Sequence, residues 1–599
     1  MSEGRVSPEI LELIRRTSTI SGCDSIYSLA PRGHRVGFYF QQRRATLLAR
    51  ALKDRLGEKL DSAKIAVIGA GITGVSFFVS LIHFGAKNVY LYESSEKFLR
   101  TGAEASHRLV HPNYNRWPML GSMDIFTSLP VLNWWAGTGE QVTGQLKKTV
   151  ESFYDTQIEN RFKPRYRCFE LTQRGPHEKM PVLAKFKCVA KTTVKETTTK
   201  EITEEEITEE EFDLAVLSVG FGDEACVAWG LEDYWTTERV PLDTATHKRE
   251  ARIFGTGDGA LIDALRCCAK EPKDAWEIPL GLIARLRDEA ACVLQEDKVN
   301  IKQESRILKF SPWEIDIQRH EESIRSASWQ MVKQSNNQVE KRYITEEKDF
   351  YVGLIRRIIQ TEKTTKTFLE ERLKPVADSK LKPQIVGKIE APFEPTSAPI
   401  NKLLLAYLLE TDRVIYTIMP DTESELKEIL SADRTSARAK IEICRYGSPK
   451  NFLSSGKKGL ADEVSVYVTS GTGTKKHEEI DLERHLIDLL SGLTGGEYVY
   501  FDAMPHPLDI ARHGHDRESV PHNTRIRFKS TIEDFAQKKL AAHVTLRSSP
   551  PKWVIQTKMT SEEVMEQLRM LGGIDGVFCG APIVLSRTVT AESVREEGF

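Results

Sequence analysis

A single stretch, residues 64–93, most strongly constrains the fold of this chain. It reads KIAVIGAGITGVSFFVSLIHFGAKNVYLYE: an apolar strand, a glycine-rich turn, a largely apolar helix, a second strand and an acid. Gly69 permits a tight turn, Gly71 lets the backbone approach a pyrophosphate, and Gly74 lets the helix lie against the sheet. Glu93 follows Gly69 by 24 positions, near the spacing of about 20 at which an acid binds a ribose. The stretch predicts a Rossmann-like dinucleotide-binding unit.

Length, charge and cysteine content narrow the class of protein. A chain of 599 residues should hold about three or four domains. Lys and Arg total 84 against 86 Asp and Glu, a balance that gives no general field for nucleic acid or a membrane surface. The charged N-terminus and the lack of a run of about 18 apolar residues lead us to expect a soluble, cytoplasmic protein. Nine cysteines without a CxxC pair predict reduced thiols, not a redox-active disulfide.

The residue pattern divides the chain into four regions. Residues 1–60 read as a helical entry segment, with one short helix at 8–16 and a longer one at 41–60. Residues 61–270 read as the dinucleotide-binding domain, with an inserted β-meander at about 165–212. Residues 271–410 carry amphipathic helices, which predict a helical cap region. Residues 411–599 alternate strands and helices and predict a C-terminal α+β domain. The fold class expected is therefore α/β.

Two further strands are expected in the sheet of this domain. They are FDLAVLSVG at 212–220 and ARIFG at 251–255, and the acid-rich segment 204–211 before the first reads as a solvated turn. The second strand runs into Gly257, Asp258 and Gly259, which open a helix. The glycines let the backbone approach a ligand, and the carboxylate can meet a ribose or ribityl hydroxyl. A glycine turn that serves packing alone is the alternative.

Polar and aromatic residues that follow Glu93 could form one wall of a cofactor or substrate site. His107, His111 and Tyr114 are the candidate catalytic residues, and Arg108 is a candidate for cofactor binding. The alternative is a structured loop whose aromatic residues belong to the core.

A second cluster lies in PHPLDIARHGHDRESVPHN, residues 505–523. His513, His515 and Asp516 are its candidate metal ligands. A phosphate site with Arg512 and Arg517 and a histidine general base are further interpretations. The spacing is not that of a helical ligand pair, which favours a loop that these residues merely solvate.

The order of these motifs resembles that of FAD-dependent oxidoreductases with a glutathione-reductase-like FAD domain. The phrases HRLVHPNYNRWP, LPVLNWWAGTGEQV, GTGDGALIDALR and APINKLLLAYLLE are also similar to a group of bacterial FAD/NAD(P)-binding oxidoreductase-like proteins, over about residues 35–410. The resemblance implies a Rossmann-like FAD/NAD(P)-binding domain with FAD as cofactor. It also implies that Gly69, Gly71 and Gly74 hold the pyrophosphate, Glu93 the adenosine ribose and Asp258 the ribityl or phosphate end of the flavin.

Three functions remain open from the sequence. The first is an FAD-binding oxidoreductase-like flavoprotein that acts on a small molecule, with NAD(P) as a candidate reductant. The second is a nucleotide-binding sensor or interaction protein whose C-terminal region contacts a protein partner. The third is a ubiquitin-activating-like adenylating enzyme, because a helix bearing Gln41 and Arg44 precedes the glycine turn. Glu93 in place of the usual Asp and the lack of metal-binding cysteine pairs argue against the third.

Overall fold

The structure is a computed structural model, and the description of the fold covers only part of the chain. The described residues are 15, 18–20, 23–29, 37–100, 102–112, 114–118, 125, 127, 129, 131–175, 178–188, 206–220, 234–235, 251–271, 273–293, 311–317, 319–321, 337–375, 382–387, 390–394, 397–418, 441–444, 467–470, 473–476, 545–549, 552–557 and 583–587.

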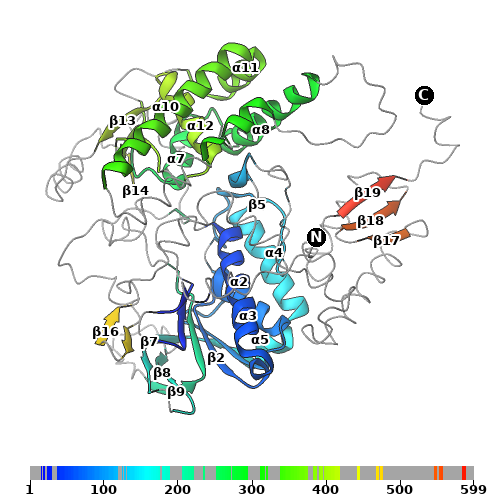
Figure 1. The fold of residues 1–599 in the computed structure, drawn as a ribbon, viewed down its shortest axis with the longest axis vertical. Helices are drawn as coiled ribbons and strands as arrows, with labels where there is room; N and C mark the ends of the chain where they lie inside the picture. Colours follow the sequence, from blue (N-terminus) through cyan, green and yellow to red (C-terminus); the bar gives the residue numbers. More distant parts are fainter. Residues whose placement is uncertain are drawn as a thin grey trace, which may run out of the picture.

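The first parallel sheet is built on residues 64–93 (Figure 1). β2 (Lys64–Ile68) and β3 (Asn88–Glu93) pair in parallel, and α3 (Ile72–His83) connects them, as the sequence predicted. β2 is apolar and buried after its first residue, as expected for a parallel strand covered on both faces. The sheet order is β1-β10-β2-β3-β6, where the other strands are β1 (Ile26–Ser28), β10 (Leu214–Leu217) and β6 (Phe162–Pro164).

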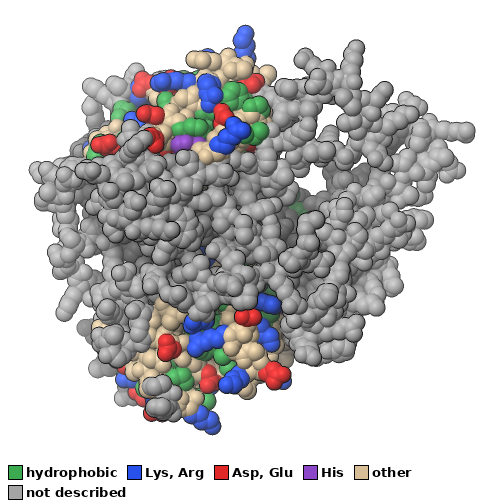
Figure 2. All heavy atoms as spheres, in the orientation of Figure 1, with side chains coloured by type: hydrophobic (Ala, Val, Ile, Leu, Met, Phe, Trp, Pro, Cys, Tyr) green, Lys and Arg blue, Asp and Glu red, His purple; other side chains and the backbone are tan. Residues whose placement is uncertain are grey.

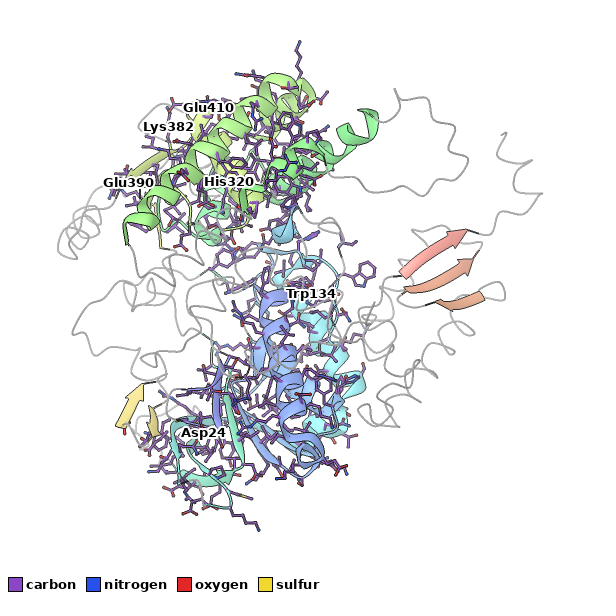
Figure 3. The ribbon with its side chains drawn as sticks, in the orientation of Figure 1. Asp24, Trp134, His320, Lys382, Glu390 and Glu410 are labelled. Carbon is purple, nitrogen blue, oxygen red and sulfur yellow. The ribbon has the colours of Figure 1, made fainter. Side chains whose placement is uncertain are left out.

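Helices cover this sheet and tie the N-terminal segment to it. α2 (Phe38–Leu56) packs on α3 and continues into a 3₁₀ turn, η1 (Gly57–Asp61), close to the predicted helix 41–60. Gln42 on α2 accepts a 2.6 Å hydrogen bond from the indole of Trp134, which Figure 3 labels beside the helix. α4 (Gly139–Phe153) and α5 (Asp155–Arg161) follow one another before β6. Thr138 and Gln141 form a capping box at the start of α4.

A meander follows the first sheet, as the sequence predicted. β7 (Tyr166–Gln173), β8 (Val182–Cys188) and β9 (Ile207–Phe212) pair antiparallel. The prediction of a solvated turn over 204–211 is wrong from residue 207 onward. β9 is an edge strand whose glutamates are paired across the sheet, so the charges suit a half-exposed strand. Two short strands, β15 (Tyr467–Ser470) and β16 (Gly473–Lys476), extend this sheet beside β7.

A second parallel sheet lies apart from the first in Figure 1, and its order is β13-β12-β11-β14. β11 (Ala251–Phe254) pairs with β12 (Gln384–Gly387) and β14 (Ile441–Cys444), and β13 (Ile415–Ile418) pairs with β12. The expectation that ARIFG joins the first sheet is therefore wrong. β13 and β14 likewise pair here and not within a separate C-terminal sheet.

The helices expected to form a cap instead connect the strands of this second sheet. α7 (Asp258–Cys268) follows β11, and α12 (Pro399–Glu410) lies between β12 and β13. Their apolar faces share one core with Ile253, Ile385 and Ile443 of the sheet. Between α7 and β12 run α8 (Asp274–Val293), α10 (Asn337–Thr361) and α11 (Lys363–Arg372).

The described C-terminal part is a small sheet of β17 (Thr545–Ser549), β18 (Lys552–Thr557) and β19 (Ile583–Arg587). The predicted helix at 8–16 and the cluster 505–523 lie outside the described residues, apart from residue 15. Within the described residues, no helix combines the length and the apolar character needed to cross a membrane. In the view of Figure 2, basic and acidic side chains of the described surface lie among one another.

Candidate functional site

The glycine turn after β2 has the geometry of a phosphate cradle. Gly69 has a φ of +98°, and a Cβ there would lie 2.7 Å from the carbonyl oxygen of Ser218. A Cβ on Gly74 would lie 1.8 Å from the carbonyl oxygen of Gly69, so glycine is what lets α3 approach the strand. A Cβ on Gly71 would meet nothing within 4 Å. Gly69 and Gly74 are thus packed against the protein backbone, whereas the space beside Gly71, where α3 begins, is open to a ligand.

Glu93 ends β3 beside this turn. One oxygen of its carboxylate accepts a 2.8 Å hydrogen bond from the backbone amide of Ala70, and the other accepts from the amide of Ser95 at 2.8 Å. Because a carboxylate offers about four acceptor sites, Glu93 keeps capacity for a further donor beyond Ala70, Ser94 and Ser95. The structure therefore brings Glu93 and the three glycines together.

The turn after β11 repeats this geometry in the second sheet. Gly255 has a φ of +123°, and a Cβ on Gly257, the residue that caps α7, would meet nothing within 4 Å. Gly255, Gly257 and Ala260 match the fingerprint G-x-G-x-x-G/A, in which alanine replaces the third glycine. Gly255 and Ala260 were not among the predicted site residues, although this alanine form of the fingerprint was the signal for them. Gly259 lies in the first turn of α7.

Asp258 is directed at α12. Its Oδ1 accepts hydrogen bonds from the backbone amide of Ala398 at 2.8 Å and from the side-chain amide of Asn401 at 2.7 Å. Both donors lie at the N-terminus of α12, where a carboxylate is favoured by the helix dipole. Burial, followed by the charge of Asp258, raises the pKa of nearby Glu394 to about 7. Asp258 thus joins α7 and α12, two helices of the second unit, by which we mean the second parallel sheet with the helices that share its core.

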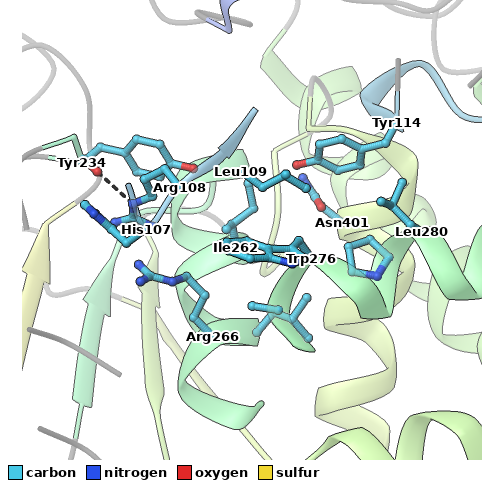
Figure 4. Close-up of a pocket in the computed structure, with 13 residues that line it drawn as sticks. His107, Arg108, Leu109, Tyr114, Tyr234, Ile262, Arg266, Trp276, Leu280 and Asn401 are labelled. Carbon is cyan, nitrogen blue, oxygen red and sulfur yellow. Dashed lines mark hydrogen bonds between the residues drawn. The ribbon is translucent and has the colours of Figure 1, made fainter. Parts of the chain in front are cut away.

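Three of the four candidates after Glu93 meet at one pocket, shown in Figure 4. Its polar lining is His107, Arg108, Tyr114, Tyr234, Arg266 and Asn401. In this view the hydroxyl groups of Tyr114 and Tyr234 point toward each other. Burial, together with Tyr234 and Asp258, raises the pKa of Tyr114, which keeps its hydroxyl protonated at neutral pH.

Arg108 forms a buried ion pair with Asp263 on α7. Its guanidinium lies 3.9 Å from the ring centroid of Tyr234, and its Nε donates to the Tyr234 carbonyl at 2.8 Å. The residue that was expected to bind cofactor therefore joins β4 (Leu109–Val110) to the second unit.

His111 is buried and is not part of the pocket lining. Its Nδ1 accepts a 3.0 Å hydrogen bond from the backbone amide of Tyr114. Burial lowers its pKa to about 4, so the ring is neutral at pH 7. The contact orients the turn that carries Tyr114.

The candidate metal ligands His513, His515 and Asp516 lie outside the described residues. Within the described part of the chain, no cluster of three or more His, Cys, Asp or Glu side chains is arranged to hold a metal ion.

No protein-family model and no curated protein matches the chain. Among solved structures, the chain is similar to a polycyclic ketone monooxygenase from the thermophilic fungus Thermothelomyces thermophila. The two share 10% sequence identity with a TM-score of 0.30, and the alignment covers 89% of this chain and 87% of that chain. This likeness is too distant to assign an activity.

Proposed function

We propose that the chain is an FAD-binding oxidoreductase-like flavoprotein that acts on a small molecule. The main support for the proposal is that an open glycine turn and a carboxylate lie next to each other, at the ends of two adjacent parallel strands. Gly71 leaves space before the N-terminus of α3, and Glu93 lies on the neighbouring strand with acceptor capacity to spare. The meander between β3 and β10 is the insertion that the resembling FAD domains carry.

The residues present fit FAD. The amides at the start of α3 would bind the pyrophosphate, since a helix N-terminus favours anions. Glu93 would accept hydrogen bonds from the adenosine ribose. The hydroxyl oxygen of Ser218, at the end of β10, lies 2.8 Å from the carbonyl oxygens of both Ile68 and Gly69. Its single proton is shared between them, which holds the turn against the sheet. When bound, FAD supplies the electron transfer, and the protein positions and screens it.

NAD(P) is the second nucleotide in the proposal, and its place would be the turn after β11. From β11 the chain passes through helices to β12, which lies on one side of β11, whereas β14 lies on its other side. The strand order therefore changes direction between β11 and β14. In open α/β sheets, ligands bind at such a switch in strand order, beyond the carboxyl ends of the strands. Gly257 is open there, as Gly71 is in the first unit. Each parallel sheet thus offers one cradle.

A matched pair of substitutions tests the two cradles separately. Gly71→Val and Gly257→Val each place a side chain in open space, at φ values of −70° and −80° that valine accepts. We expect Gly71→Val to purify without flavin absorbance. We expect Gly257→Val to retain FAD but to lose reduction by NADH or NADPH under anaerobic conditions. Gly144→Val, at an open position on α4, is the control that should keep both properties.

Two outcomes would contradict the proposal. A wild-type protein that shows no flavin absorbance, before or after incubation with FAD, would exclude a flavoprotein. A bound flavin that neither NADH nor NADPH reduces would favour the sensor or interaction protein. ATP–pyrophosphate exchange by the wild-type protein would instead support the adenylating enzyme.

A further inference from the structure

Two arginines of the pocket share a single carboxylate. Oδ1 of Asp263 is bonded to Nη1 of Arg108 and, at 3.2 Å, to Nη1 of Arg266. The side chains are 2%, 5% and 1% exposed for Arg108, Arg266 and Asp263. Within the described residues, neither arginine is paired with a second carboxylate. The group therefore carries one buried positive charge in excess.

The excess charge faces the pocket. Arg108 and Arg266 line it, whereas Asp263 lies behind them. Only Nη1 of Arg266 has a protein acceptor among the described residues, so its remaining N–H groups are available to a ligand. Burial and the neighbouring charge of Arg108 lower the pKa of Arg266, whereas Asp263 raises it.

Among the described residues, the acids on the elements next to the pocket are engaged elsewhere. Asp258 is directed at the N-terminus of α12. Asp274 accepts a 3.0 Å hydrogen bond from the amide of Glu271 at the start of α8. Each acid is thus already compensated by a helix N-terminus, whose dipole favours negative charge. An anion that enters the pocket would remove the imbalance beside Arg266.

The rest of the pocket is apolar. Leu109, Ile262, Leu265, Trp276, Pro279 and Leu280 line it. Apolar walls with a few convergent polar groups are the usual form of a small-molecule site. A phosphate ion would satisfy the charge but leave these walls without a partner, whereas an organic acid would use both.

We propose that this pocket binds a small organic carboxylate, with Arg266 and Arg108 facing the carboxylate and Trp276 and Leu280 facing an apolar body. Binding of the carboxylate does not require the flavin. If the chain is the proposed flavoprotein, the bound acid would be its substrate, and that second statement rests on the proposed function. The continuous contacts from Arg108 through Tyr234 and Trp235 to Phe38 on α2 link the pocket to the helix that covers the first cradle.

The test is calorimetric titration of the full-length protein with propionate, an acid small enough for the pocket, and with its neutral isostere propanamide. We expect propionate to bind at least about 10-fold more tightly, the size of one charge-assisted hydrogen bond. Arg266→Gln should reduce this preference to about 1-fold, because the second guanidinium is then gone and Asp263 balances the charge of Arg108. Arg285→Gln, whose guanidinium lies over Phe368 away from the pocket lining, should keep the preference.

Equal affinity for the acid and the amide would overturn the proposal, as would a preference that survives Arg266→Gln. Displacement of propionate by an equal concentration of inorganic phosphate would also overturn it, because the apolar walls would then play no part. Since calorimetry does not depend on flavin absorbance, the result is separable from that of the glycine variants. Thermal unfolding of Arg266→Gln confirms that the variant is folded.

Discussion

The guanidinium of Arg108, beside the first sheet, is bonded to the carboxylate of Asp263 on α7 of the second unit, with Nη2 and Oδ2 3.4 Å apart. Residues 155 positions apart in the chain thus meet in a buried ion pair. Arg108 lines the pocket shown in Figure 4, so the pair joins the two units beside that pocket. Its position makes the stability of this junction and the charge of the pocket depend on the same carboxylate.

Asp263→Asn should destabilise the protein much more than Arg266→Gln. The first change leaves two buried guanidinium groups without a counter-charge and should lower the free energy of unfolding by about 3–5 kcal/mol. The second leaves Arg108 paired and should change it by less than about 1 kcal/mol. Urea unfolding followed by circular dichroism measures both. Equal losses for the two variants would show that the charges are not shared as described.

Gly74→Ala and Gly71→Ala should separate the packing role of the glycine turn from its binding role. A Cβ at position 74 would overlap the carbonyl of Gly69, so we expect a loss of about 1–3 kcal/mol. A Cβ at position 71 meets open space at a φ of −70°, so stability should be unchanged or should rise by about 0.5 kcal/mol. Thermal and urea unfolding distinguish them, and a large loss for Gly71→Ala would contradict the geometry.

Asp258→Ala tests whether this acid serves the flavin or the fold. The structure shows its carboxylate bonded to Ala398 and Asn401 at the start of α12. Loss of such a helix-terminal contact costs about 0.5–2 kcal/mol, so stability should fall by that amount. The flavin content of the purified protein should remain that of the wild type. A selective loss of FAD at unchanged stability would instead support the ribityl contact implied by the family resemblance.

The free energy of unfolding should fall as pH decreases from 6.5 to 4. Burial lowers the pKa of His83 and of His111 from 6.5 to about 4 in the folded protein. Between pH 6.5 and pH 4 these histidines bind a proton in the unfolded chain but not in the folded protein. The stability that the two neutral histidines allow is therefore fully present above pH 6.5 and is lost as the pH falls toward 4. Each histidine contributes at most about 3 kcal/mol. Urea unfolding at pH 7.5 and 5 should differ, and His83→Leu should reduce the difference.

The sequence pattern predicted those helices and strands that are fixed by residues near them in the chain. Residues 64–93 form the strand, helix and strand expected of them, and α4 begins after Thr138, where Thr138 and Gln141 form a local capping box. The segment 207–211 was misread because cross-strand pairing, which a run of glutamates does not reveal, makes an edge strand of it. The three glycines and Glu93 meet because one turn and one crossover place them together.

The sequence by itself determined that a glycine turn and an acid would stand at neighbouring strand ends, because the βαβ connection is short and its handedness is restricted. It did not determine which sheet ARIFG would join, because apolar parallel strands carry no mark of their partners. Only the tertiary structure placed β11 beside β12 and β14, turned Asp258 toward α12, and brought Arg108 against Asp263. These contacts join residues more than a hundred positions apart, and burial within the second unit and at its junction with the first, not local propensity, selects them.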